Sequence, residues 1–489
     1  MVRHHIDSYR ILLSLLWETK TWRLLALIFL QLVGQLLLLP LLPTWVTNDF
    51  ASRRAGEEMH CDEFKPSESP ASCQDAHADV VQASTISGFF QNTVFSILVS
   101  PALGAWSDVH GRVPVILISQ FLSIMPITVV IMNLHGMIPM YWLYVVQAFT
   151  GSISLIAPSL AYISDVIDPD NRAAAFGLIL ASFSVAVVIG PPIGAKLDPM
   201  MAPYVTLGII ALASVLTYLF LPESVDSNES HQAREILSSS GSVVQSTWRA
   251  ISILKRNSLF IKLTLILMFT AVVSEGLQDI LIQYLQLKMG FNAKDVSQMF
   301  MLLGAGALLV QGVLLQLLLR LFGEARLLCL GLLMSTLQQS SLIFATKKWE
   351  ALGAVFLGSF TSVTFPTISS IKANNSAEHE QGSVQGALYG ARSFFGGVGP
   401  LAFAYLFKIF SASDSNLPYF PGAPFVLGAI MMLLTTALAW SLSPDAGGNA
   451  GTLFSSSESK ITSSSPRNHS SKPMDAFDIE EELHLLAPT

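Results

Sequence analysis

Long, uninterrupted apolar runs recur along the whole chain and constrain its fold more than any other feature. A helix needs about 20 apolar residues to cross the hydrocarbon core of a bilayer, where every backbone polar group must be hydrogen-bonded internally. Twelve such runs occur, at 24–45, 81–104, 114–133, 139–163, 174–195, 203–222, 259–284, 294–319, 326–345, 349–372, 384–408 and 421–442. They predict an all-α integral membrane protein with twelve transmembrane helices.

Composition agrees with this reading and excludes several classes of protein. Only 12% of the 489 residues are charged, about half the usual fraction, and the mean hydropathy is +0.54. A soluble enzyme, a disordered protein and a disulfide scaffold are therefore excluded. The net charge of −7 comes from residues 46–80 and 443–489, whose balances are −5 and −4. The remainder is weakly positive, so we expect no nucleic-acid partner.

An even number of spans places both termini on the same side of the membrane. With the termini inside, the inner segments carry 17 Lys and Arg residues and the outer loops nine. Basic residues favour the cytosolic side, so we expect both termini in the cytosol.

The spans divide into two groups of six. We expect a cytosolic N-terminus at 1–23, a first bundle at 24–222 with an extracytosolic loop at 46–80, a serine-rich linker at 223–258, a second bundle at 259–442 and a disordered tail at 443–489. A glycine followed 13 residues later by Gly-Pro occurs in the fifth span and again in the eleventh, 209 residues on. This repetition suggests a duplicated transporter with a central site between its halves.

The loop between the second and third runs carries a charged motif. A glycine, Gly104, is followed four residues later by Asp108 and then by Gly111-Arg112. This resembles the cytosolic loop motif of the major facilitator superfamily, whose members are secondary transporters built from two six-helix bundles.

The resemblance implies a cytosolic gate. Asp108 would cap the start of the eleventh helix, and Arg112 would pair with Asp165 at the end of span four, with Arg172 nearby. We expect these interactions, including a charge pair across the halves, to favour the outward-open state. Val109 and Val113 replace basic residues common in the family, so a weaker clamp is expected. The alternative is an ordinary charged turn.

The fifth span is similar to the antiporter motif of the same superfamily. Ala186, Gly190 and Gly194 form a stripe of small residues that allows close helix contact. Prolines should bend the helices near this stripe and at its repeat. The residues expected at these kinks are Gly190, Pro191, Pro192, Gly194, Gly399 and Pro400. The motif implies export by exchange, and simple packing is the alternative.

Charged side chains within the spans are candidates for coupling and solute binding. Glu275 and Asp279 lie one turn apart in span seven, and Arg392 lies in span eleven on the cytosolic side. Glu275 is the expected proton carrier. Because Arg392 lies nearer the cytosolic side, we expect it to stay away from Glu275. The alternatives are that Asp279 lies at the membrane interface, that Glu275 is a structural hydrogen-bonding group, and that the Arg392 side chain extends to the cytosolic interface.

Amides within the spans are candidates for lining the solute cavity. Gln147 replaces an arginine of the drug–proton antiporters, which puts proton coupling through span four in doubt. Each amide taken alone is more often a contact between helices. The full cavity set is Gln31, Gln35, Gln91, Asn92, Gln147, Gln283 and Arg392.

Two cysteines share the 46–80 loop. Cys61 and Cys73 lie on the side that faces an oxidising lumen, so we expect them to form a disulfide. No cluster has metal-ligand spacing and no phosphate-binding glycine loop occurs, so no metal, cofactor or ATP-driven pumping is expected.

The tail ends with an acid followed by a Leu-Leu pair, formed by Glu481, Leu485 and Leu486. This resembles the dileucine signal read by clathrin adaptors, and it favours an endolysosomal or vacuolar membrane over the plasma membrane.

Several further segments look like the hippocampus-abundant-transcript branch of the superfamily, with tetracycline-resistance transporters as wider neighbours. They are Pro222-Glu223-Ser224, 284–292, Thr364-Phe365-Pro366, 381–386 and Gly399-Pro400. The resemblance implies a monomeric, non-enzymatic transporter of a small organic solute, proton-coupled and working by alternating access, with an exporter or antiporter as one form. The alternative is a transporter-like sensor or trafficking adaptor that moves no solute.

Overall fold

The computed structural model describes residues 17–66, 68–151, 153, 155–167, 169–224, 258–375, 381–412 and 418–442. Helices make up the regular structure of these residues, and they contain no strand. All of them fall within one compact unit, Met1–Gly447. The predicted linker, the tail with its sorting motif and the first 16 residues lie almost wholly outside the described part of the chain.

In the first half of the sequence the helices cover the six apolar runs, and two of them extend into the predicted 46–80 loop from its two ends. They are α2 (Thr21–Leu37), α3 (Leu42–Ala55), α4 (Ala71–Phe89), α5 (Ser96–His110), α6 (Arg112–Leu134), α7 (Tyr141–Thr150), α8 (Ile156–Val166), α9 (Pro169–Gly194) and α10 (Ala202–Phe220). A 3₁₀ turn occupies Cys61–Glu63, and a π-helical segment, Phe90–Phe95, joins α4 to α5.

The second half repeats this pattern. Its helices are α13 (Ser258–Met289), α14 (Ala293–Leu309), α15 (Leu315–Phe344), α16 (Lys348–Gly358), α17 (Thr364–Asn374), α18 (Gln381–Ser411) and α19 (Ala423–Trp440). A π-helical segment, Val310–Leu314, joins α14 to α15, and a 3₁₀ turn, Ser359–Val363, joins α16 to α17. Gly323 has a φ of 71° and breaks α15 near its start.

Nine stretches of the described residues are long and apolar enough to cross a membrane. They are Thr21–Ala55, Arg112–Leu134, Ala202–Phe220, Ser258–Met289, Ala293–Leu314, Leu321–Phe344, Lys348–Lys372, Ala391–Ser411 and Ala423–Trp440. The other three predicted runs coincide with α4 to α5, with α7 and α8, and with α9. The all-helical membrane fold is thus supported, and the total of twelve spans stays a prediction.

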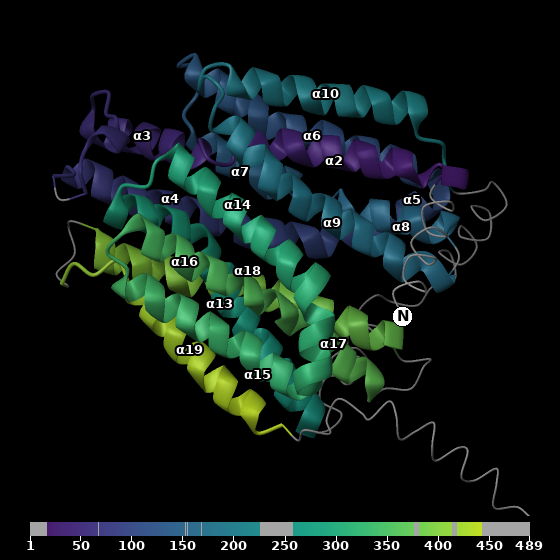
Figure 1. The fold of residues 1–489 in the computed structure, drawn as a ribbon. Coiled ribbons are helices and arrows are strands. Elements are labelled where there is room, and N and C mark those ends of the chain that lie inside the picture. The colour runs from purple at the N-terminus through teal and green to yellow at the C-terminus, as the bar shows by residue number, and fades with distance from the viewer. Residues whose placement is uncertain are drawn as a thin grey trace, which may run out of the picture. The chain divides into compact units, whose positions relative to one another are not determined.

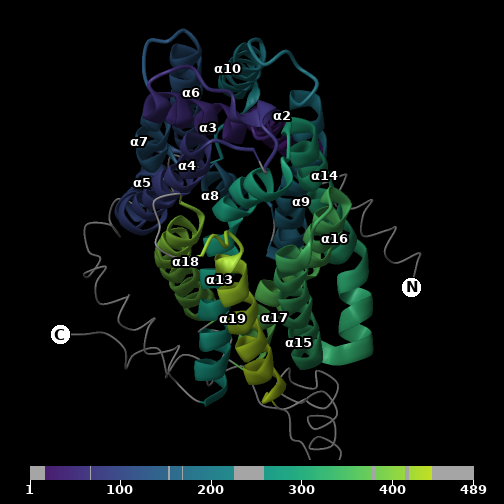
Figure 2. The same cartoon turned by 90° about the vertical axis from the view of Figure 1, so that its left-hand side faces the viewer.

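Corresponding helices of the two halves pack in corresponding ways. In the first half α2 packs against α9 and α10, and α6 packs against α10 (Figure 1). In the second half α13 packs against α18 and α19 (Figure 2). The α2–α9 and α13–α18 pairs join spans one and five and spans seven and eleven, so the packing agrees with the sequence repeat.

Many large apolar side chains lie on the surface of these helices. Tyr218, Phe344 and Trp440 are each at least 75% exposed. Such surfaces would be unfavourable in water, but in a bilayer they face acyl chains that are as apolar as they are. The exposed apolar surface therefore agrees with a lipid-facing exterior.

Candidate functional site

Arg112 is the centre of a charged cluster at the start of α6. Its side chain lies 2.5 Å from Asp108 Oδ1 and 2.9 Å from Asp165 Oδ2, and it donates a 2.6 Å hydrogen bond to Ser107. The Arg112 and Asp165 side chains are only 13% and 18% exposed. The cluster joins the ends of α5, α6 and α8.

Glu223, which follows α10 at the end of the first half, also contacts this cluster. Its carboxylate accepts hydrogen bonds from the backbone N–H groups of Arg112 and Val113, at 2.7 and 3.1 Å. Gly111 has a φ of 101°, and a Cβ at this position would collide with the Glu223 carboxylate. Because both conditions exclude a larger residue, glycine is required here. We call the end of the molecule with Arg112, Asp165 and Glu223 the gate side.

The expected pair of Arg112 with Asp165 is present, but it does not cross the halves. Arg112, Asp108 and Asp165 all belong to the first half, because the Asp165 carboxylate lies beside α6 at the end of α8. Gly104 is exposed on α5, with open space where a Cβ would point. The side chain of Arg172, and those of the first seven residues of α18, lie outside the described part, so the proposed capping by Asp108 stays a prediction.

The small residues of the fifth span bring α9 against α2. A Cβ on Gly190 would lie 2.8 Å from Leu36 Cβ, and one on Gly194 would collide with the Leu37 carbonyl oxygen. Pro191 and Pro192 lie within the last turns of α9, which runs through them to Gly194. At the repeat in α18, a Cβ on Gly399 would lie 2.7 Å from Val272 Cα, and Pro400 is likewise accommodated within the helix. The stripe therefore serves close packing.

Glycines also mark two contacts between the halves. A Cβ on Gly304 of α14 would lie 2.9 Å from Val188 of α9, and one on Gly397 of α18 would collide with the Thr93 hydroxyl. The pairs α9–α14 and α4–α18, and the contact of α18 with the π-helical segment Phe90–Phe95, join the two halves.

The charged pair of α13 and α18 contradicts the expected separation. Arg392 Nη2 lies 3.3 Å from Glu275 Oε1, and the Arg392 guanidinium lies 4.9 Å from the centre of the Phe365 ring. A Cβ on Gly396 would lie 3.0 Å from Glu275 Cγ, so Gly396 is level with Glu275. Arg392 is one turn below Gly396, about 6 Å along the axis, and its long side chain bridges that distance. A count of residues from each helix start takes no account of side-chain length, so it does not predict this contact.

Asp279 lies one turn beyond Glu275 on α13. It is exposed, and it interacts with Ser84 of α4 and, electrostatically, with Glu275 and with Tyr144 of α7. Asp279 therefore meets groups of the first half. Arg392, Glu275 and Asp279 follow one another along the α13–α18 pair, in that order from the gate side.

The candidate cavity amides fall into two groups. Gln31 is 1% exposed and donates a 2.8 Å hydrogen bond to Ser123, and Gln283 is 4% exposed. Both hydrogen-bond to residues of neighbouring helices, as the alternative of a contact between helices describes. Gln35 and Asn92 are exposed, whereas Gln91 and Gln147 are half-buried and Gln91 packs over Gly151. These four keep the predicted role as a proposal.

At the opposite end, which we call the loop side, Gln283 joins the halves. Its Oε1 atom accepts hydrogen bonds from Thr47 at 3.2 Å and from His77 Nδ1 at 2.6 Å. Since Oε1 has no proton, His77 must hold its proton on Nδ1. His77 precedes the 81–104 run, and burial lowers its pKa to about 4, although the hydrogen bond to Gln283 opposes this shift. No sequence pattern predicts this role, since a single His has no characteristic spacing.

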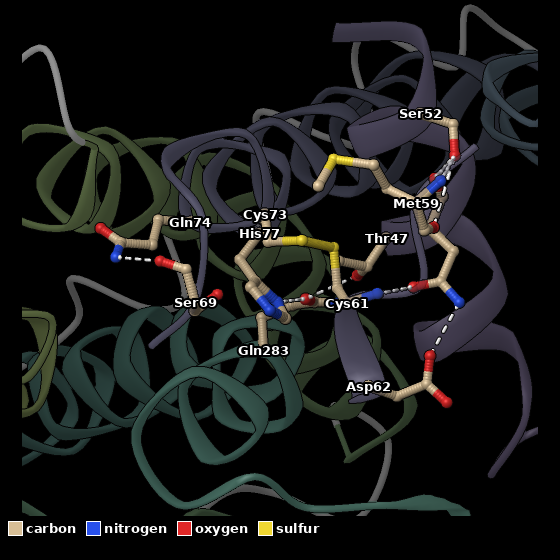
Figure 3. The surroundings of a disulfide bond; sticks show 11 residues. Thr47, Ser52, Met59, Cys61, Asp62, Ser69, Cys73, Gln74, His77 and Gln283 are labelled. Atoms are coloured by element: carbon tan, nitrogen blue, oxygen red, sulfur yellow. Dashed lines mark hydrogen bonds between the residues drawn. A yellow bond between two sulfur atoms is a disulfide. The ribbon is translucent and has the colours of Figure 1, made fainter. Parts of the chain in front are cut away.

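A disulfide joins Cys61 to Cys73 next to this contact. Figure 3 shows His77, Gln283 and Thr47 beside it. Cys73 is fully buried against Ala51 and Ala76, and the Cys61 N–H donates to Asn48. The bridge therefore ties the loop to α3 and α4.

Further polar contacts join the halves at the loop side. Gln286 donates to Thr44 at 3.1 Å, and Lys408 of α18 donates to Gln82 at 2.5 Å and lies 3.5 Å from Asp79. These residues were also missed by the sequence analysis, because such pairs depend on tertiary contact.

The described residues contain no group of three or more His, Cys, Asp or Glu side chains arranged to hold a metal ion.

Comparison with known proteins decides the family. A model described as "Major Facilitator Superfamily" matches residues 24–337. The chain belongs to the Major Facilitator Superfamily. It is thus a multi-pass membrane transporter, and the resemblance of the Gly104–Arg112 motif is confirmed.

The relatives agree with this membership. The chain is 25% identical to hippocampus abundant transcript-like protein 1 of Homo sapiens, over 71% of this chain and 70% of that protein. It is 23% identical to the class B tetracycline resistance protein of Escherichia coli, over 73% and 86%. Both relatives named from the sequence are confirmed, and neither is an enzyme.

A solved structure of the same superfamily has a similar fold. The human organic anion transporter MFSD10 (TETRAN) matches with a TM-score of 0.55 and 20% identity, covering 86% of this chain and 99% of that one. At this identity the match shows the fold alone.

Proposed function

We propose that the chain is a proton-coupled secondary transporter that moves a small organic solute by alternating access. The observation that carries the proposal is the Arg392–Glu275 pair, which is 40% and 37% exposed although it lies in two apolar helices. Charges in a span are costly unless they serve a pathway, so a half-exposed pair next to helices of both halves fits a transport site.

Contacts at the two ends of the molecule support alternating access. On the loop side, Gln283, Gln286 and Lys408 hydrogen-bond with the first half. On the gate side, the Arg112 cluster forms its contacts within the first half. This is the pattern of a carrier closed on the loop side. With the termini in the cytosol, the loop side would face the lumen or exterior.

The sense of transport does not follow from the fifth span. The relation to tetracycline resistance proteins hints at an exporter. However, the antiporter-like stripe is occupied by packing against α2. We therefore base the sense of coupling on the charged groups of α13 and α18.

Reconstitution tests this proposal. Purified protein in proteoliposomes would be offered a labelled panel of anionic, neutral and cationic organic solutes, with and without a pH step. We expect at least one solute to accumulate under the pH step, and a protonophore to abolish the accumulation. If no solute moves even by exchange, the proposal fails and the sensor or adaptor alternative replaces it.

A further inference from the structure

Arg392 has more hydrogen-bond donors than the surrounding protein uses. A guanidinium carries five N–H donors in a planar fork that fits a carboxylate with two parallel bonds. Among the described residues, Glu275 is the one hydrogen-bond partner of Arg392, and the contact is a single one at 3.3 Å. Strong bonds between opposite charges are about 2.7–2.9 Å long and often doubled. The Arg392 guanidinium therefore uses few of its N–H donors within the described protein.

Phe365 and Gly396 hold this fork in place. Phe365 covers the guanidinium at 4.9 Å, which fixes its plane. Gly396 lets the α18 backbone approach Glu275 closely. The two contacts keep Arg392 beside Glu275 and leave 40% of its side chain exposed.

We propose that Arg392 binds the carboxylate of an organic anion and that the anion displaces Glu275, which takes up the proton. In the empty site, the Glu275 carboxylate pairs with Arg392. When a proton and an anion enter, Glu275 becomes a neutral acid, and the solute carboxylate replaces it on Arg392. The charge of the site is the same before and after, so an ion pair is exchanged without leaving an isolated charge in the membrane.

The neighbouring groups fix where the anion binds. Asp279, one turn toward the loop side, repels a second negative charge near that end of Glu275. The neighbours of Asp279 include Ser84 from α4 and Tyr144 from α7. The α17 helix contributes Phe365 to the pair, and α19 has no titratable side chain. The carboxylate therefore binds on the gate side of Glu275, at Arg392.

This inference rests on the proposed transport function and assigns the mode of coupling between proton and solute. Because the proton and the anion bind together, they cross together and the transporter is a symporter. That outcome differs from the exchange implied by the antiporter-like motif of the fifth span.

A binding experiment tests the site without requiring transport. The probes are lactate, benzoate and 2-naphthoate, each with its neutral amide, bound to the purified full chain at about pH 5.5 and about pH 7.5, where the free acids are ionised. We expect at least one carboxylate to bind about tenfold more tightly than its amide, the usual value of a charged hydrogen bond. The preference should weaken at the higher pH, because anion binding in this scheme takes up a proton.

Variants separate the roles of the two residues. In Glu275→Gln, carboxylate binding should depend less on pH than in wild-type protein. Arg392→Gln should abolish the preference for carboxylate over amide, and Arg392→Lys should retain part of it, because the charge remains and the fork is lost. Lys262→Gln is the control, since Lys262 pairs with Ser441 at the start of α13, away from the site. Thermal unfolding checks that each variant is folded.

The results that would overturn the inference are distinct from failure of transport. Equal binding of acids and amides to wild-type protein contradicts it, as does a carboxylate preference that survives in folded Arg392→Gln. A pH dependence as large in Glu275→Gln as in wild-type protein would contradict the role of Glu275. If a neutral solute accumulates with the pH step and Arg392→Gln does not affect it, the chain is a transporter and the anion site is wrong.

Discussion

Two sets of ion pairs, around Arg112 and around Arg392, differ in how tightly the protein encloses them. Arg112 has two carboxylate partners and a hydroxyl, and its side chain is 13% exposed. Arg392 has one carboxylate partner, and both members of that pair are more than a third exposed. The cost of an unpaired charge is high in both places. Only the second pair is exposed enough to exchange its partner. We therefore propose that the contacts of Arg112 are structural and that the Arg392–Glu275 pair takes part in transport.

Protonation of His77 should destabilise the loop side, because the charge of the imidazolium would be buried there. Its pKa falls from 6.5 in the unfolded chain to about 4 in the folded protein. The contribution of the neutral ring is therefore complete above pH 6.5 and is lost as the pH falls toward 4, at a cost of about 3 kcal/mol. His77→Gln should flatten the pH dependence of thermal unfolding in this range. The exposed His135, changed to Gln, should leave it unchanged, and identical pH profiles for wild type and His77→Gln would contradict the assignment.

Removing the charge of Asp108 should loosen the gate side. Asp108 is 47% exposed, so its bond to Arg112 contributes about 1 kcal/mol at most. Asp108→Asn should raise the rate at which an impermeant maleimide labels Gly104→Cys, by up to about fivefold. The control is Asp198→Asn, at the opposite end of the first half. Unchanged labelling in folded protein would remove Asp108 from the gate.

Sequence patterns predicted helix contacts well and helix breaks poorly. The stripe of Gly190 and Gly194 was visible as small residues one turn apart, and α9 does pack there against α2. The π-helical segments Phe90–Phe95 and Val310–Leu314 were not predicted, because an extra residue in a helical turn leaves an apolar run unchanged. Their positions, in spans two and eight, correspond in the two halves. The link from His77 to Gln283 depends on tertiary contacts that no local pattern encodes.

A methyl group at Gly194 should separate α9 from α2. The added Cβ would collide with a backbone carbonyl, which cannot move aside as a flexible side chain can. Gly194→Ala should lower the free energy of unfolding by about 1–3 kcal/mol. Gly208→Ala is the matched control, because Gly208 also lies in a helix and open space surrounds its Cβ position. That change should be neutral or stabilising by less than about 1 kcal/mol. Equal melting temperatures for the two variants in detergent would contradict close packing at Gly194.

At the scale of the whole molecule, hydropathy predicted the membrane fold and the charged motif predicted the superfamily. Both predictions rest on properties of single segments, and the match over residues 24–337 supports them. The site was predicted in part. Glu275 and Arg392 were identified as costly charges, but their pairing was missed, because it depends on how α13 and α18 are aligned.

The tail should direct the protein to an endolysosomal or vacuolar membrane. Leu485→Ala together with Leu486→Ala should move a tagged protein to the cell surface, because the signal that these residues and Glu481 resemble is read by clathrin adaptors. Fluorescence microscopy and surface biotinylation measure the shift. An unchanged distribution would favour a plasma-membrane location or another signal.

The most direct test of the central claim compares pH-driven accumulation by wild-type protein and by Glu275→Gln in proteoliposomes. The glutamine keeps the shape of the side chain and cannot take up a proton. The account predicts that the variant loses accumulation under a pH step and retains solute exchange at equal pH. If Glu275→Gln still accumulates solute against its gradient on a pH step, Glu275 is not the proton carrier and the account is wrong.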